Sequence, residues 1–289
     1  MRSTLKDLLA PAQVQNYGVG AFNIYNLEGA TAVVQAAEEL NSPVILQLLP
    51  SALKMGGRPL VSLCTSLADK ASVPVAVHLD HCSSAEIIDQ ALGYGVDSVM
   101  ADGSELDLAR NISFTREIVE RVRSTNGYGG VEAELGKISG MEDGEIVEAH
   151  HQQMTKPDEA LTFVRETGAD ALAVCIGNVH GTYHRPPQLD FNRLDEIAAK
   201  VNIPLVLHGT SGLPDEMITR VIGYGVCKFN VNTEIRSAYL GRMRHLLCQH
   251  DRCELTTLMK EAINSMKDVV KEKIRLFGSA EKVLAYEPS

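Results

Sequence analysis

The chain has 289 residues, enough for one large domain, and α/β barrels commonly fill about 250 residues. Its formal net charge of −10 argues against a nucleic-acid partner, because phosphate backbones are bound by clustered Lys and Arg side chains. No apolar run reaches the roughly 18 residues of a membrane span, and residues 1–13 lack the apolar segment of a signal peptide. The six cysteines show no CxxC pairing, so we expect a reduced, cytoplasmic protein without a membrane partner.

Short apolar runs alternate with longer segments of helical period from near residue 20 to near residue 250. The runs are continuous rather than alternating, which indicates strands that are buried on both faces of a parallel sheet. Eight strands are expected, at Gly20–Ile24, Pro43–Leu49, Val73–Leu79, Ser98–Ala101, Gly130–Leu135, Ala171–Ile176, Pro204–Leu207 and Val226–Asn230. This count predicts the α/β class and a (β/α)8 TIM barrel, with a doubly wound sheet as the alternative.

Residues typical of helix starts precede several of the helical segments. Ser84 is expected to cap a helix over Ala85–Leu92, and Pro157 stands where the first turn of a later helix would lie. The apolar residues of Leu255–Leu276 predict a C-terminal helical extension. We therefore interpret residues 1–289 as a single barrel domain with this extension.

Two stretches of the sequence resemble each other at an offset of 130 residues, from Pro74 to Pro204. Each proline opens an apolar run that reaches a histidine four residues later, at His78 and His208. Four strand–helix units of about 30 residues would give this spacing. Either a half-barrel duplication or repeated use of one loop chemistry explains the match.

Three histidines lie where predicted strands end and loops begin. His81 follows the run that ends at Leu79, His180 comes after ALAVCIGNV, and His208 ends PLVLH. The carboxyl ends of parallel strands meet at one edge, where ligands bind. A single histidine in such a place is more often a structural polar residue, but three of them beside Asp80 predict a metal site with one open position.

The longest gap between predicted elements is Gly136–Thr155, an acidic segment punctuated by glycines. A segment of this length inside a compact barrel predicts a lid or an active-site arm. A disordered insertion is the alternative.

Seven motifs together resemble the class II, metal-dependent ketose-bisphosphate aldolases, the fructose- and tagatose-bisphosphate aldolase family. They are GAFNIYN at Gly20–Asn26, HLDH at His78–His81, SVMADGS at Ser98–Ser104, VEAELG at Val131–Gly136, GNVHGTY at Gly177–Tyr183, HGTSGLP at His208–Pro214 and NVNTEIR at Asn230–Arg236. They run in the order of the family over nearly the whole chain. The resemblance implies a TIM barrel that reversibly cleaves a phosphorylated ketose of the 1,6-bisphosphate type to dihydroxyacetone phosphate and an aldehyde.

The resemblance implies one catalytic Zn2+ held by His81, His180 and His208. A Lewis acid suits the reaction, because cleavage of the C3–C4 bond leaves a carbanion and no Schiff-base lysine is evident at a strand end. Asp80 is similar to the acid/base of the family at the C4 hydroxyl, and Glu142 to the glutamate that moves the C3 proton. A role for Asp80 in orienting a histidine is the alternative.

Further residues are expected around this centre. Asp102 and Glu134 match positions that hold a second or alternate metal in relatives, or they brace the histidines. The substrate and its phosphate are expected to contact Asn23, Gly181, Gly209, Ser211, Asn230, Asn232 and Thr233. The resemblance also implies Na+ or K+ near Gly181.

Two departures from the family pattern affect the choice of substrate. His184 stands where many relatives have lysine, and a leucine replaces the serine after the second strand, with Ser51 nearby. Arg275, or an arginine of a neighbouring subunit, is a candidate for the distal phosphate, since a homodimer or homotetramer is expected. A sugar-acid phosphate as substrate, or an inactive barrel that binds sugar phosphates, are the alternative functions.

Overall fold

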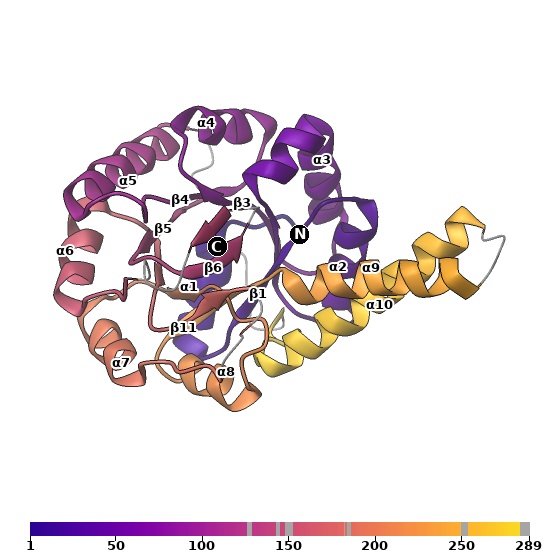
Figure 1. Ribbon diagram of the computed structural model, residues 1–289. Coiled ribbons are helices and arrows are strands. Elements are labelled where there is room, and N and C mark those ends of the chain that lie inside the picture. The colour runs from indigo at the N-terminus through magenta and orange to yellow at the C-terminus, as the bar shows by residue number, and fades with distance from the viewer. Residues whose placement is uncertain are drawn as a thin grey trace.

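The computed structural model describes residues 1–125, 129–142, 145–147, 153–181, 183, 186–249 and 254–283, and only the backbone of 140–142 and 145–147. Eight parallel strands form a closed barrel (Figure 1). They are β1 (Val19–Asn23), β2 (Val44–Leu48), β3 (Val75–Cys82), β4 (Ser98–Ala101), β5 (Val131–Leu135), β8 (Ala171–Val174), β10 (Leu205–Leu207) and β11 (Val226–Val231). The first strand pairs with the last, as in Ala21 opposite Asn230, and this closure excludes the doubly wound alternative.

Helices surround the barrel on the outside (Figure 1). They are α2 (Leu27–Glu39), α3 (Pro50–Lys70), α4 (Ala85–Tyr94), α5 (Leu108–Arg123), α6 (Pro157–Thr167), α7 (Phe191–Lys200) and α8 (Asp215–Ile222). The side chain of Ser84 accepts a hydrogen bond from the backbone N–H of Ile87, which confirms the predicted cap of α4. None of the described helices is long and apolar enough to cross a membrane.

The amino end of the barrel is closed by α1 (Leu5–Gln15), a helix that the sequence analysis did not predict. Thr4 and Asp7 form a capping box that fixes its start. Its apolar face packs against small and apolar residues that point into the barrel, among them Ala21, Ala76 and Ala173. This end of the interior is therefore apolar, and the polar interior residues gather toward the carboxyl ends of the strands.

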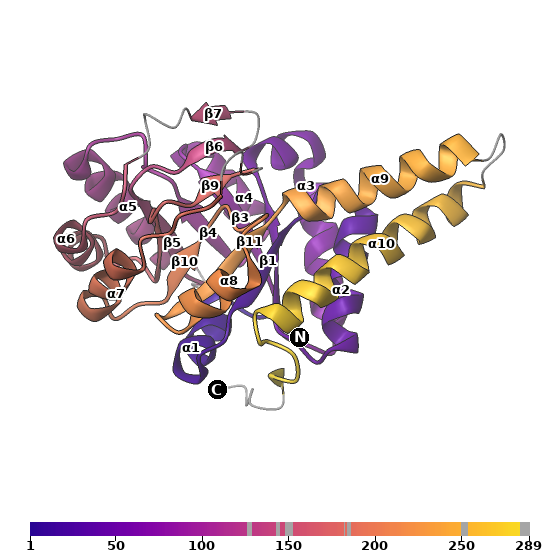
Figure 2. The same cartoon turned by 60° about the horizontal axis from the view of Figure 1, so that its bottom comes forward.

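The C-terminal extension forms an arm. Helix α9 (Thr233–Gln249) leads away from the barrel, and α10 (Leu255–Leu276) returns to it (Figure 2). Along α10 the buried residues are Leu258, Ala262, Met266, Val270 and Ile274. This face packs chiefly on α2, so α10 fills the place of the eighth outer helix, between α8 and α2.

We expect Ile274→Ala to destabilise the fold by about 2–4 kcal/mol, because the truncation leaves a cavity where α10 meets the barrel. Denaturant unfolding measures the loss. Val14→Ala, at a side chain of α1 that is 81% exposed, is the control and is expected to change stability by less than about 0.5 kcal/mol. An equal, small effect of both changes would contradict the place of α10 in the core.

A small second sheet lies over the carboxyl ends of the strands, opposite α1 (Figure 2). It consists of β6 (Ser139–Glu142), β7 (Glu145–Val147) and β9 (Val179–His180). β6 runs antiparallel to β7 and parallel to β9. Within the described part of the predicted lid segment, β6 and β7 thus form an antiparallel pair, and β6 is hydrogen-bonded to the strand that carries His180.

Candidate active site

The three predicted histidines come together at the carboxyl end of the barrel. Their ring centroids lie 4.5 Å apart for His81 and His208, 5.1 Å for His81 and His180, and 5.9 Å for His180 and His208. One ligand nitrogen from each ring lies within 4.8 Å of the other two. Residues from three separate strand ends therefore face one small volume.

A bulge in β3 brings Asp80 and His81 to the same site. Neighbouring residues of a regular strand point to opposite faces. Here the pairing of β3 with β4 shifts register between Leu79 and Cys82, and His81 has φ 45°, in the left-handed region. This irregular backbone turns the His81 ring inward while Asp80 stays buried in the interior.

Two of the histidines each form a hydrogen bond to a carboxylate through one ring nitrogen. His81 Nδ1 lies 2.8 Å from Asp102 Oδ2, and His208 Nε2 lies 2.8 Å from Glu132 Oε1. A carboxylate only accepts, so these nitrogens carry the hydrogens. The remaining nitrogens, His81 Nε2 and His208 Nδ1, face each other at 2.7 Å. Two such atoms need a proton or a cation between them.

The electrostatics of the site favour a cation there. Burial and the charges of His81 and Lys228 lower the pKa of His208 well below its ordinary value, and burial with the His81 charge lowers the pKa of His180 to about 3. Burial opposes the charged form of His81, but Asp80, Asp102 and Glu134 together hold its pKa well above the ordinary value. His180 and His208 therefore favour the neutral ligand form, and the carboxylates that favour a proton on His81 would also favour a divalent ion such as zinc in its place.

Two acidic residues flank the histidines. Asp102 follows β4, and its Oδ1 accepts hydrogen bonds from the backbone and the hydroxyl of Ser104. Glu134 on β5 is buried, with its Oε2 3.9 Å from His81 Nδ1 and without a hydrogen-bond partner among the described residues. Burial, reinforced by Asp102, raises the pKa of Glu134 well above its ordinary value. His81, Asp102 and Glu134 form a second group with metal-ligand spacing.

Asp80 is fully buried and is held at both oxygens. Asn23 donates to its Oδ2 and Asn230 to its Oδ1, each at 3.0 Å. Gln47, at 2.9 Å, donates in turn to Asn23 Oδ1. Two residues that were predicted to contact substrate thus orient the predicted acid/base, and their contact with substrate stays a prediction.

Comparison with known proteins decides the family. The family described as fructose-bisphosphate aldolase class-II matches residues 3–282. The chain belongs to this class II aldolase family. It is an aldolase, and its closed barrel is the fold that solved aldolase structures share.

Solved structures of other aldolases superpose over nearly the whole chain. The YdjI aldolase from Escherichia coli K12 has 34% identity and a TM-score of 0.86, and the match covers 98% of this chain and 100% of that one. A candidate fructose-1,6-bisphosphate aldolase from Coccidioides immitis has 34% identity and a TM-score of 0.91, covering 98% and 99%. Fructose-bisphosphate aldolase from Campylobacter jejuni, at 21% identity, TM-score 0.81 and coverage of 96% and 95%, shares the fold.

The predicted phosphate-binding residues of this aldolase gather around the ends of β9, β10 and β11. Gly209 has φ 61°, and a Cβ there would lie 2.3 Å from the carbonyl oxygen of Val179, so only glycine fits. Gly181 is also in the left-handed region. Ser211 donates to Glu234 Oε2 at 2.7 Å. Thr233 begins α9. The first backbone N–H groups of a helix have no partner within the helix, so a helix start is suited to binding an anion.

Asn232 and Ser51, two further predicted residues, take different positions. Asn232 lies between β11 and α9 and accepts a hydrogen bond from the hydroxyl of Tyr25 at 3.0 Å. Ser51 is exposed in the first turn of α3. Glu142 lies on β6, and its side chain is outside the described part of the structure, as is His184.

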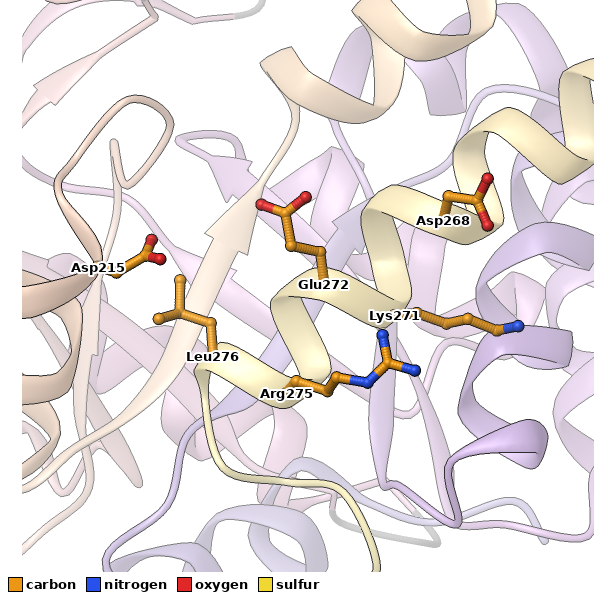
Figure 3. A pocket seen from close by; sticks show the side chains of 6 residues that line it. All are labelled: Asp215, Asp268, Lys271, Glu272, Arg275 and Leu276. Atoms are coloured by element: carbon orange, nitrogen blue, oxygen red, sulfur yellow. The ribbon is translucent and has the colours of Figure 1, made fainter.

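Arg275 lies on α10 and lines an open groove of about 720 Å³ between α8 and α10 (Figure 3). The other lining residues are Asp215, Asp268, Lys271, Glu272 and Leu276. None of these residues belongs to the histidine cluster. The structure therefore does not bring Arg275 of the same chain together with the other predicted site residues.

Sequence reasoning missed Gln47, Glu132 and Lys228, which are fully buried in the barrel. Lys228 Nζ lies 2.9 Å from Glu132 Oε2, and Glu132 holds His208. Charged residues inside the apolar runs VEAEL and VCKFN were the available signal, because ionised side chains are almost never buried without a partner.

Proposed function

We propose that this aldolase is metal-dependent, with zinc as its cofactor, and reversibly cleaves a phosphorylated ketose of the 1,6-bisphosphate type to dihydroxyacetone phosphate and an aldehyde. The observation that carries the proposal is the convergence of His81, His180 and His208 beside a buried carboxylate. When bound, the ion supplies Lewis-acid stabilisation of the negative charge that develops on the ketone as the C3–C4 bond breaks.

Asp80 serves as the base in cleavage. Its carboxylate takes the proton of the C4 hydroxyl as the aldehyde forms, and it returns that proton to the aldehyde oxygen during condensation. Asn23 and Asn230 hold the carboxylate in one orientation, which lowers the entropic cost of reaching the reactive geometry. Glu142 is proposed to move the C3 proton of dihydroxyacetone phosphate.

The remaining site residues have proposed supporting roles. Asp102 fixes the orientation of His81, and together with Glu134 it offers an alternate metal position. Gly181, Gly209, Ser211, Asn232 and Thr233 are proposed to bind the substrate phosphate through backbone N–H groups and short side chains, and Gly181 to lie beside a Na+ or K+ ion.

Removing the metal is expected to abolish cleavage. Incubation with a strong chelator followed by desalting should remove activity, and added Zn2+ should restore it. The rival mechanism uses a Schiff-base lysine, for which the buried Lys228 is a candidate in the barrel interior. Lys228 is ion-paired with Glu132, so borohydride with substrate is expected to leave the enzyme active. A trapped lysine adduct, or full activity after chelation, would refute the metal mechanism.

The substrate is best found by a screen. Candidate ketose phosphates, with sugar-acid phosphates among them, are assayed for zinc-dependent release of a triose phosphate. We expect turnover with at least one ketose 1,6-bisphosphate. Activity confined to a sugar-acid phosphate would support the alternative substrate class.

The arm is proposed to support a homo-oligomer, a dimer or tetramer, in the cytoplasm. Leu240, Leu247 and Leu255 are large apolar residues of the arm that are more than half exposed. Three large, exposed apolar side chains on the projecting arm favour contact with a second copy of this chain. Light scattering of the purified protein measures the assembly size.

A further inference from the structure

A layer of three ionisable side chains, His78, Glu132 and Lys228, lies in the barrel interior beside the histidine cluster. All three are 0% exposed. Glu132 Oε2 lies 2.9 Å from Lys228 Nζ and 3.5 Å from His78 Nε2. Its other oxygen, Oε1, lies 2.8 Å from His208 Nε2. Glu132 is therefore the common neighbour of His78 on β3, Lys228 on β11 and His208, which directly follows β10.

Such a layer is costly in a barrel core. Each buried ion loses several kcal/mol of hydration, and replacement of a buried pair by apolar residues is often neutral or stabilising. The amino end of the same barrel is filled with apolar side chains, so this fold does not require charges in its interior. The position of Glu132 between Lys228 and His208 points to a role at the site.

The hydrogen-bond chemistry defines that role. An ionised Glu132 only accepts, so the hydrogen between it and His208 resides on Nε2 of the ring. In the neutral ring the lone pair is then on Nδ1, which is the nitrogen that faces His81 Nε2. Asn230 Nδ2, 3.2 Å from His208 Nδ1, favours the same tautomer. Without the carboxylate, Nε2 loses its acceptor, and the tautomer with the hydrogen on Nδ1, which presents no lone pair to an ion there, becomes more populated.

We propose that Glu132 is a positioning residue that favours one tautomer of His208 and fixes the direction of its ring, with Lys228 as the counter-charge that holds the Glu132 carboxylate in place. This inference rests on the proposed metal site. Lys228 also donates to Asn230 Oδ1 at 2.6 Å, and Asn230 in turn holds Asp80. One buried ion pair thus connects a metal ligand with the support of the proposed base.

A matched pair of double variants isolates the hydrogen bond from the charge. Glu132→Leu/Lys228→Met and Glu132→Gln/Lys228→Met both remove one negative and one positive charge and keep similar volumes, so both are expected to fold. The glutamine retains an oxygen that can accept from His208 Nε2, and its NH2 group would face His78 Nε2, which lacks a hydrogen-bond partner in the described structure. The leucine retains no acceptor.

Zinc affinity is measured by competition with a chromophoric chelator. We expect the leucine variant to bind zinc about 10- to 100-fold more weakly than wild type, and the glutamine variant to stay within about threefold of it. Equal affinity of the two variants would overturn the inference. If wild type binds no zinc, the proposed function fails instead.

A second readout needs no metal. The ¹⁵N chemical shifts of the His208 ring in the metal-free protein report which nitrogen carries the hydrogen. We expect the Nε2–H form in wild type and in the glutamine variant, and a lower population of that form in the leucine variant, where the Asn230 amide alone favours it. An Nδ1–H form in wild type would overturn the inference whatever the zinc affinities are, so this measurement remains decisive if a variant folds poorly.

Discussion

Asp80→Ala is expected to lower kcat for ketose cleavage by about 10²- to 10⁴-fold, the usual contribution of a general acid–base residue. The carboxylate is the buried acceptor that lies beside the histidine cluster and is oriented by two amides. Asp80 is not in the group of histidines with ligand spacing, so its loss is expected to leave the zinc content near that of wild type. Steady-state kinetics and metal analysis of the same preparation give both numbers.

Asp80→Asn and Asp158→Ala complete the test of Asp80. The amide keeps the volume of the side chain but cannot take a proton, so we expect a loss similar to that of the alanine variant. Asp158 lies on the surface, paired with Lys200, and its removal is expected to leave kcat unchanged. Turnover within tenfold of wild type in Asp80→Ala would show that Asp80 orients a neighbour instead of transferring the proton.

Lys228→Met is expected to destabilise the fold by about 3–5 kcal/mol, because it removes one partner of a buried ion pair and leaves Glu132 without its counter-charge in the barrel core. Urea unfolding at neutral pH measures the change. Adding Glu132→Gln to this variant removes the stranded charge, and we expect it to restore most of the loss.

Lys200→Met is the surface control for Lys228→Met. It breaks an ion pair with Asp158, whose side chain is 90% exposed, so a change below about 1 kcal/mol is expected. If Lys228→Met changed the free energy of unfolding as little as this control, the buried ion pair would make no measurable contribution to stability.

The barrel was predictable because buried parallel strands leave continuous apolar runs, and all eight predicted strands are present. The predicted ends of these strands were less accurate. The strand predicted to reach Ile176 ends at Val174, because the backbone N–H of Cys175 is bound by Thr155 and that of Ile176 by Asn178. The strand predicted to end at Leu79 continues to Cys82 through a bulge, which a pattern of apolar residues does not reveal.

The site was predictable to the same extent. The histidines and Asp80 follow apolar runs, and the topology of a parallel barrel brings such positions together. Glu132 and Lys228 lie inside apolar runs on two strands that are distant in sequence. No local spacing of residues therefore predicts that they pair. The helix α1 was also missed, although Thr4 and Asp7 form a capping box at its start.

The barrel closes between segments that are synthesised far apart in time. β1 hydrogen-bonds to β11, and the helix that covers α2 is α10, the last helix of the described chain. A ribosome-bound nascent chain that ends before Leu255 contains the eight strands of the barrel but still exposes the apolar face of α2 that α10 covers. The ribosome must therefore synthesise the chain through α10 before this barrel can bury its first strand–helix unit, and chaperones can bind the exposed apolar surface until then.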